Sequence, residues 1–293
     1  MSNDLRLRDF FGKRTSVMSQ IHLLEFPSDQ GVSINSGRPG SAKAPELIRA
    51  ALGNLTPHAM HYQKHTDIFE RTQLAGVIPC DKEVETDQKR LAAAVSDRLK
   101  TGIMPIVLGG GHETAFGHFL GYAQSDMPVT IINIDAHADV RPLKNGKAHS
   151  GSSFRQAVDH DSGLCSSYHV FGLNPSSVSL EHFHYVKKCG APIFDYETTQ
   201  EKIQEKLQET EGNIMISMDM DAVSQADAPG VSAPNTSGIS KDLWLNLAFS
   251  FGKCSKVTSF DICEVNPLFD RDGQTVKLAA LTIWSFLLGY SMR

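Results

Sequence analysis

The segment VTIINIDAHADVRP, residues 129–142, decides both the fold and the candidate site of this chain. Its first six residues are mostly apolar and β-branched, which predicts a short, buried strand. The strand runs directly into Asp135, His137 and Asp139, which are spaced two residues apart. In extended backbone, residues at this spacing share one face, so we expect the three side chains to point the same way. The segment therefore predicts a buried strand with a polar cluster at its carboxyl end.

Outward from this segment, short apolar runs alternate with helical patterns. Further strands are predicted over residues 103–108, 168–171, 193–194, 213–217 and 257–260, and helices over residues 45–52, 87–100, 114–124, 202–209, 241–251 and 276–288. Residues 31–45 are rich in Gly, Ser and Pro and predict a loop. The alternation predicts an α/β fold with a mostly parallel sheet covered by helices on both faces. Neither a repeat nor a long linker divides the chain, so we expect one domain over residues 1–293.

Three other predicted strands also end in polar segments. These segments are GGGHE at 109–113, SMDMD at 217–221 and DICEVNP at 261–267. Ligands of open α/β sheets bind beyond the carboxyl ends of the strands. Asp219 and Asp221 repeat the two-residue spacing, and His112 follows glycines that permit a tight turn. Each motif alone is common in solvated loops, but their shared position at strand ends indicates one site.

The residue types at these strand ends indicate a metal site. Four aspartates crowded at one edge would repel one another strongly, and two divalent cations would balance their charge. Oxygen ligands with two imidazoles and no thiolate favour an ion such as Mn²⁺ over structural zinc.

The composition excludes several other classes of protein. The chain has 28 basic and 33 acidic side chains, a net charge of −5 that does not favour nucleic-acid binding. Its apolar runs are far shorter than the roughly 20 residues of a membrane span, and its first residues carry no secretory signal. Five scattered cysteines without a CxxC pair predict no disulfide framework. We expect a cytoplasmic protein with a small-molecule partner, and with neither nucleic acid nor membrane as partner.

The motifs GGGHE, DAHAD, SMDMD and DICEVNP together resemble those of the arginase/agmatinase (ureohydrolase) family over most of the chain. The resemblance implies a three-layer α/β/α sandwich and two Mn²⁺ per subunit. It implies as metal ligands His112, Asp135, His137, Asp139, Asp219 and Asp221. It also implies that Glu264 holds the cationic amidine or guanidine group of the substrate. A homo-oligomer is compatible with the family, but no pattern in the sequence defines an interface.

Within the family, GGGHETAFGH at 109–118, DAHADVRP at 135–142 and SGSSFRQA at 150–157 are similar to the formimidoylglutamase branch. That branch implies hydrolysis of N-formimidoyl-L-glutamate to L-glutamate and formamide in histidine degradation, by attack of a metal-activated hydroxide on the amidine carbon. An agmatinase or guanidino-acid hydrolase of the same family is the alternative within the class. A non-catalytic metal-binding member and a two-metal phosphoesterase are alternatives of other classes. The intact ligand set and Glu264 argue against a non-catalytic member. An acidic Glu264 and the scarcity of basic groups argue against a phosphoesterase, whose substrate is anionic.

Two departures from the wider family concern proton transfer and the metal site. Ser150 stands where arginases and agmatinases carry a histidine that is thought to shuttle protons. By resemblance Asp139 is the first proton acceptor, and His149 or Glu113 could relay the proton, although Glu113 equally fits a structural role at a helix start. After Asp221, the family usually shows Asp and Pro where this chain has Ser224 and Gln225; neither lost residue is a ligand in the family pattern.

Recognition of the substrate's carboxylates needs cationic or amide side chains. Arg141 lies two residues after Asp139, where other members of the family place a residue that contacts the substrate's α-carboxylate. The resemblance therefore implies a bidentate pair between Arg141 and a substrate carboxylate. Asn35 and Ser150 are further candidates for substrate binding. Arg38 and Arg155 are weaker candidates, because each fits a surface ion pair better.

Overall fold

A single parallel sheet forms the centre of the structure, a computed structural model that describes residues 4–13, 20–194 and 200–293. Within these residues, eight strands pair in the order β2-β1-β3-β8-β7-β4-β5-β6, every pair in parallel. The strands are β1 Ile21–Phe26, β2 Thr72–Val77, β3 Met104–Gly109, β4 Val129–Ile134, β5 Cys165–Leu173, β6 Gly190–Phe194, β7 Asn213–Asp219 and β8 Val257–Cys263. The predicted parallel sheet is therefore confirmed.

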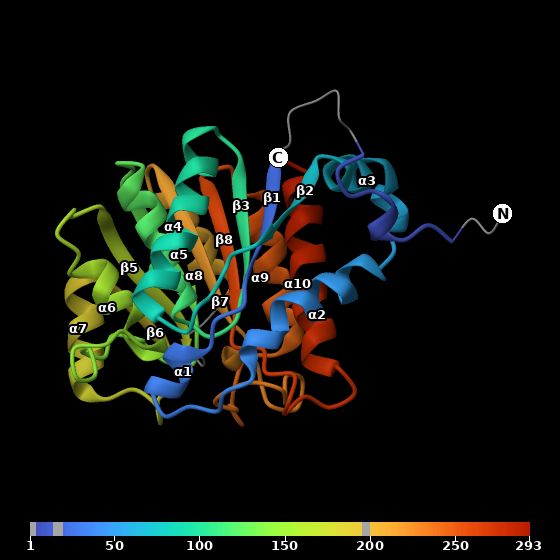
Figure 1. Cartoon of the computed structure of the whole chain (residues 1–293). Helices are drawn as coiled ribbons and strands as arrows, with labels where there is room; N and C mark the ends of the chain where they lie inside the picture. Colours follow the sequence, from blue (N-terminus) through green and yellow to red (C-terminus); the bar gives the residue numbers. More distant parts are fainter. Residues whose placement is uncertain (1–3, 14–19, 195–199) are drawn as a thin grey trace.

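Helices connect successive strands and cover both faces of the sheet (Figure 1). The α-helices are α1 Gln30–Ile34, α2 Ala44–Gly53, α3 Tyr62–Glu70, α4 Val84–Lys100, α5 Thr114–Gln124, α6 Ser153–Val158, α7 Leu180–Cys189, α8 Gln200–Glu209, α9 Lys241–Lys253 and α10 Gln274–Tyr290. Short 3₁₀ helices are η1 Leu7–Asp9, η2 Ser41–Lys43, η3 Ala59–His61, η4 Ser150–Ser152 and η5 Met220–Ala222. In the described part of the chain, no helix is long and apolar enough to cross a membrane.

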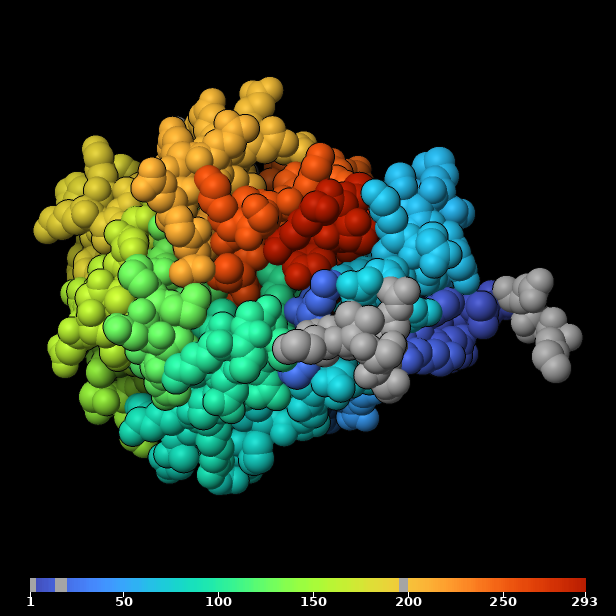
Figure 2. Space-filling model, turned by 90° about the horizontal axis from the view of Figure 1, so that it is seen from above, coloured from blue at the N-terminus to red at the C-terminus, as the bar shows by residue number. Residues whose placement is uncertain are grey.

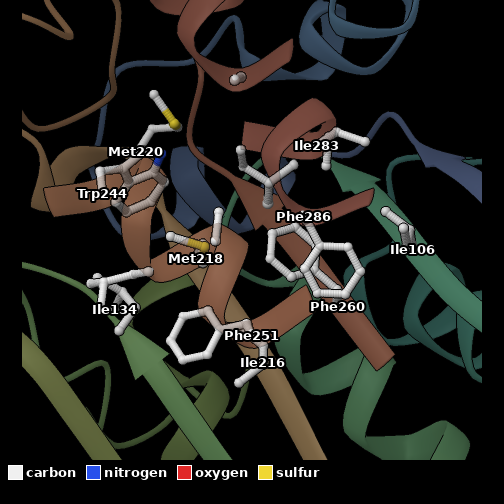
Figure 3. Packing of buried hydrophobic residues seen from close by; sticks show 14 of the residues in the cluster. Ile106, Ile134, Ile216, Met218, Met220, Trp244, Phe251, Phe260, Ile283 and Phe286 are labelled. Atoms are coloured by element: carbon white, nitrogen blue, oxygen red, sulfur yellow. The ribbon is translucent and has the colours of Figure 1, made fainter. Parts of the chain in front are cut away.

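Two hydrophobic cores lie on opposite faces of the sheet, because side chains alternate along each buried strand. In β3, Ile106 and Leu108 belong to the core under α2, α3, α8, α9 and α10, whereas Val107 belongs to the core under α4, α5, α6 and α7. Figure 2, which views the edge where the strands begin, shows these two helical layers on opposite sides. Figure 3 shows the first core, where Phe260 and Phe286 pack with ring centroids 4.6 Å apart. The result is the three-layer α/β/α arrangement.

The predicted elements from residue 87 onward are all present, and β4 and α5 have the predicted bounds. The predicted loop at 31–45 is wrong in part, since α1 and η2 lie within it. Besides the 3₁₀ helices, six elements have no predicted counterpart: β1, β2, α1, α3, α6 and α7. β2 is an edge strand whose side chains are mostly exposed, so it lacks the apolar run that identifies a buried strand.

Candidate metal centre

The four central strands deliver the polar segments to one edge of the sheet. β3, β8, β7 and β4 are neighbours in that order, and each ends beside one of the segments identified in the sequence. His112 follows β3, Asp135 follows β4, Asp219 ends β7 and Glu264 follows β8. The predicted convergence is therefore confirmed.

The predicted ligands fall into two groups that share Asp135. In the first, which we call the His112 group, the Nδ1 atom of His112 lies 3.2 Å from Asp135 Oδ2, 3.0 Å from Asp139 Oδ2 and 3.0 Å from Asp219 Oδ2. In the second, the His137 group, His137 Nδ1 lies 3.0 Å from Asp221 Oδ2 and 3.6 Å from Asp135 Oδ1. Asp135 thus offers one oxygen to each group, as a ligand bridging two cations would.

The chemistry of this cluster fits two cations. His112 Nδ1 is buried among three carboxylates, yet it has no hydrogen-bond partner among the described residues, so the four atoms converge on a common point. Burial opposes a charge on His112, but the attraction of Asp135, Asp139 and Asp219 outweighs it and raises the pKa of His112 well above its usual value. Burial and repulsion from neighbouring carboxylates raise the pKa of Asp219 well above its ordinary range. Positive charge is therefore what this site lacks.

Side-chain turns, rather than extended backbone, orient the ligands. Asp135 Oδ1 accepts a hydrogen bond from His137 N at 2.7 Å, and Asp219 Oδ1 accepts one from Asp221 N at 2.8 Å. Each carboxylate thus forms a turn with the backbone two residues further along the chain. Asp221 lies in η5, and Asp139 has a φ of 44°. The expectation of extended backbone is wrong, although the side chains do converge. Met218 and Met220 pack into the core (Figure 3).

A cavity of about 190 Å³ opens onto both groups. Its polar lining includes Glu264 and Ser232, whose oxygen atoms can accept hydrogen bonds. It also includes Arg141, the amide of Asn35 and the hydroxyl of Ser150. The lining residues are Val32, Asn35, Ser36, Gly37, His137, Asp139, Arg141, Ser150, Asp219, Asp221, Ser232, Ala233 and Glu264.

Glu264 presents a free carboxylate oxygen in this cavity. Its Oε1 atom accepts from His112 N at 2.7 Å, and its own N–H donates to Gly110 O at 2.7 Å. The Oε2 atom of Glu264 and the Oγ atom of Ser232 are buried and make no hydrogen bond to the described residues. Burial raises the pKa of Glu264 to about 8, although the neighbouring Ser232 hydroxyl opposes the rise, and a cation bound beside Glu264 would lower this pKa again and favour the ionised carboxylate. Both orphaned atoms are suited to accept hydrogen bonds from a cationic group.

Arg141 and Asn35 form a polar pair on the cavity wall. Arg141 Nη1 donates to Asn35 Oδ1 at 2.9 Å, and Asn35 Nδ2 donates to Ser150 Oγ at 3.1 Å. Arg141 is exposed and has no carboxylate partner among the described residues. The guanidinium therefore remains available to an anionic ligand.

Two residues considered for proton transfer lie outside the cavity lining. His149 Nε2 is 3.1 Å from the carbonyl oxygen of Pro142, and burial lowers the pKa of His149. Glu113 Oε1 accepts from Ser28 Oγ and Gly31 N, both at 2.9 Å, so it holds the start of α1. The structure therefore does not bring His149 or Glu113 together with the other site residues.

The two weaker arginine candidates have different surroundings. Arg155 lies 3.6 Å from carboxylates of both Asp159 and Glu181, in the ion pairs expected for it. Arg38 makes no such pair; it donates to the carbonyl oxygens of Ser232 at 3.0 Å and Val231 at 2.9 Å. Arg38 therefore shapes the cavity by holding the loop that carries Ser232, and the expectation of a surface ion pair is wrong for it.

The sequence patterns did not identify the two residues whose side chains form hydrogen bonds with the predicted ligands. Asn133 Nδ2 donates to Asp135 Oδ2 at 3.0 Å, and Ser217 Oγ lies 2.9 Å from His112 Nε2. Both residues stand two positions before a predicted ligand, on the same face of their strands, and this spacing was the available signal. Ser232 left no comparable signal, since it lies in a loop without a strand pattern.

Fold and site together define a metal-dependent hydrolase of the arginase class, and the chain belongs to the arginase family, whose sequence model matches residues 19–289. Similar proteins include the formimidoylglutamase of Geobacillus thermodenitrificans, 36% identical over 98% of this chain and 89% of that protein. The formimidoylglutamase of Streptococcus pyogenes is 33% identical over 96% of this chain and 86% of its own length. A crystal structure of Trypanosoma cruzi formiminoglutamase with two Mn²⁺ has a TM-score of 0.90 and 27% identity, covering 99% of this chain and all of that one (100%).

Proposed function

We propose that this chain is a binuclear manganese hydrolase that cleaves N-formimidoyl-L-glutamate to L-glutamate and formamide. The relatives named formimidoylglutamase support this assignment over nearly the whole chain. The observation that carries it is the cavity itself. Orphaned acceptors on Glu264 and Ser232 suit an amidinium. The guanidinium of Arg141, which has no carboxylate partner among the described residues, suits a carboxylate.

The two ligand groups would each hold one divalent cation. The His112 group offers one nitrogen and three carboxylates, and the His137 group offers one nitrogen and two. When bound, two such cations make water a nucleophile at neutral pH and stabilise developing negative charge. Carboxylate and imidazole donors without thiolate suit Mn²⁺.

Glu264 and Ser232 would orient the reacting end of the substrate. The formimidoyl group is an amidine, which is cationic when protonated. Its N–H groups can donate to Glu264 Oε2 and Ser232 Oγ, and a hydrogen bond to a charged acceptor is about twice as strong as a neutral one. Held this way, the amidine carbon faces the two ligand groups.

Asp139 would carry the proton. Its carboxylate lines the cavity beside both the ligands and the bound substrate. Water adds to the amidine carbon, the bond from that carbon to the α-nitrogen breaks, and Asp139 passes the proton from water to the departing nitrogen. His149 was the other candidate, but it does not line the cavity, so we assign proton transfer to Asp139 alone.

Arg141 and Asn35 would hold the other end of the substrate. A guanidinium can pair with a carboxylate through two parallel hydrogen bonds, and Asn35 already fixes one edge of Arg141. Ser150, on the same wall, can donate a further hydrogen bond. Agmatine lacks a carboxylate and would gain nothing from Arg141. A role in histidine degradation and a cytoplasmic location are parts of the same proposal.

A substrate panel tests the assignment. Mn²⁺-loaded protein would be assayed on N-formimidoyl-L-glutamate, arginine, agmatine and guanidinobutyrate, with formamide and urea measured separately. We expect the highest kcat/KM on N-formimidoyl-L-glutamate, loss of activity on chelation and recovery with Mn²⁺. A higher kcat/KM for urea release from a guanidino compound would overturn the assignment in favour of another ureohydrolase.

A further inference from the structure

A chain of buried hydrogen bonds runs from His112 back into the interior of the protein. His112 Nε2 lies 2.9 Å from Ser217 Oγ, and the Ser217 hydroxyl donates to Asp261 Oδ1 at 2.7 Å. The other oxygen of Asp261, Oδ2, lies 2.6 Å from His118 Nδ1. All four side chains are buried, and they come from the end of β3, from β7, from β8 and from α5.

Asp261 sets the direction of every hydrogen bond in this chain. An ionised carboxylate only accepts hydrogen bonds, so Ser217 must give its single proton to Asp261. The Ser217 oxygen is then left to accept from His112 Nε2, which must carry its proton there. When His112 is neutral, its Nδ1 atom therefore keeps a lone pair, and Nδ1 is the atom that faces the three carboxylates.

Other contacts fix the backbone and the ring orientation of His112. The link to Asp261 therefore controls the tautomer of the ring. The backbone N–H of His112 donates to Glu264, and its carbonyl accepts from Ser153 Oγ at 2.8 Å. The ring of Phe154 meets the imidazole edge-on, with centroids 5.2 Å apart. Position and orientation are thus set independently of the Ser217–Asp261 link.

We propose that Asp261 and His118 are positioning residues for the metal centre. Through Ser217 they hold His112 in the tautomer whose Nδ1 can bind a cation, and they make that nitrogen a better donor. The proposal rests on the two-cation function proposed above. Because the Nδ1 atom of His112 faces the His112 group and not the His137 group, the effect should fall on one of the two cations.

A purely structural explanation is that the His118–Asp261 contact simply ties α5 to β8. The chain offers a matched control for that explanation. Tyr122, also in α5, places its Oη atom 2.6 Å from Ser259 Oγ and 2.7 Å from Thr258 Oγ1, both in β8. Tyr122→Phe removes buried hydrogen bonds between the same two elements without touching the link to His112.

The experiment is a titration of metal-free protein with Mn²⁺, in which free Mn²⁺ is counted by electron paramagnetic resonance. We expect two ions per chain for the wild type. Asp261→Asn keeps the shape of the side chain but removes an acceptor that cannot donate. We expect it to lower the affinity for one of the two Mn²⁺ ions by about 10- to 100-fold and to leave the affinity for the other within roughly threefold of the wild type. Ser217→Ala should show the same asymmetry. His118→Asn keeps a hydrogen-bond donor in the region of the His118 Nδ1 atom, so it should lower the affinity for this ion less than His118→Leu does.

Four results bear on the inference. Weakening of a single ion in Asp261→Asn and Ser217→Ala, with Tyr122→Phe unchanged, supports it. Unchanged affinity for both ions in folded Asp261→Asn or Ser217→Ala overturns it. Equal weakening in Tyr122→Phe overturns it in favour of a structural tie. Failure of the wild type to bind two ions overturns the proposed function itself, and with it this inference.

Discussion

Glu264 has the most constrained position of the residues assigned to the substrate. Its φ of 67° is unusual for a residue with a side chain, and both its N–H and its Oε1 hold the loop that carries His112. Glu264→Gln keeps this shape and removes the charge that holds the amidinium. We expect kcat/KM to fall by about 10²-fold, roughly 2.7 kcal/mol of transition-state stabilisation, with both metal ions retained. Steady-state kinetics and metal analysis measure this, and unchanged kinetics would make Glu264 a structural residue.

Arg141 decides the preference for an acidic substrate. Arg141→Ala should raise KM for N-formimidoyl-L-glutamate and should not affect metal binding, since Arg141 contributes no ligand atom. Because Arg141 is exposed, its pair with a carboxylate should contribute up to about 1 kcal/mol, which corresponds to a rise in KM of roughly fivefold. The measurement is the ratio of kcat/KM for the acid to that for an amidine without carboxylates, which should fall in this variant.

Arg155 offers the matched control for Arg141. It is an arginine of the same region, but its ion pairs with Asp159 and Glu181 leave no role in the site. Arg155→Ala should leave the ratio unchanged, and Arg141→Lys should rescue it poorly, because an ammonium cannot reproduce the planar guanidinium. The same ratio in Arg141→Ala and wild type would show that Arg141 does not recognise the acid.

At the scale of single elements, the sequence predicted the strands and helices whose burial is one-sided or complete. β4 is buried at every position and α5 follows a glycine run, so both had clear limits. β1 carries His22 and Glu25 among its apolar residues, which obscures the strand pattern, although all of it lies in the sheet. The ligands were predictable because they follow strands, whereas the turns at Asp135 and Asp219 depend on side-chain hydrogen bonds that residue spacing does not specify.

Packing between α3 and α10 makes stability depend on pH through His65. This residue lies under Trp284, with ring centroids 4.8 Å apart, and burial lowers the pKa of His65 to about 4 from 6.5. The unfolded chain therefore binds a proton that the folded protein does not, and stability should fall as pH drops from about 6.5 to about 4, then level off. A single group with this shift contributes up to about 3 kcal/mol.

The variant His65→Phe keeps an aromatic ring against Trp284 and removes the titration. Its free energy of unfolding should depend less on pH between about 4 and 6.5 than that of the wild type, although its stability at neutral pH falls because His58 N loses its acceptor, 3.1 Å away on His65 Nδ1. Urea titrations at several pH values, in chelator, measure this difference. Parallel pH profiles for the two proteins would exclude His65 as the titrating group.

At the scale of the whole molecule, the cations should stabilise the fold. The ligands come from strands at the centre of the sheet, so ions that bind only the folded chain add about 2.7 kcal/mol at 100 times their Kd. Asp221→Asn should lose at least one ion and most activity, because a neutral amide replaces a carboxylate. Mn²⁺ should raise the Tm of the wild type more than that of this variant. Full metal content and full turnover in Asp221→Asn would contradict the two-ion site.

The central claim is that the enzyme breaks the bond between the amidine carbon and the α-nitrogen of N-formimidoyl-L-glutamate. Addition of water to the amidine carbon allows either of two nitrogens to leave. Nuclear magnetic resonance of a reaction with substrate labelled with ¹³C at the formimidoyl carbon distinguishes them directly. We predict ¹³C-labelled formamide and an equal amount of unlabelled L-glutamate, because Asp139 delivers its proton to the α-nitrogen. Labelled N-formyl-L-glutamate with ammonia, or no reaction by the Mn²⁺-loaded protein, would contradict the account.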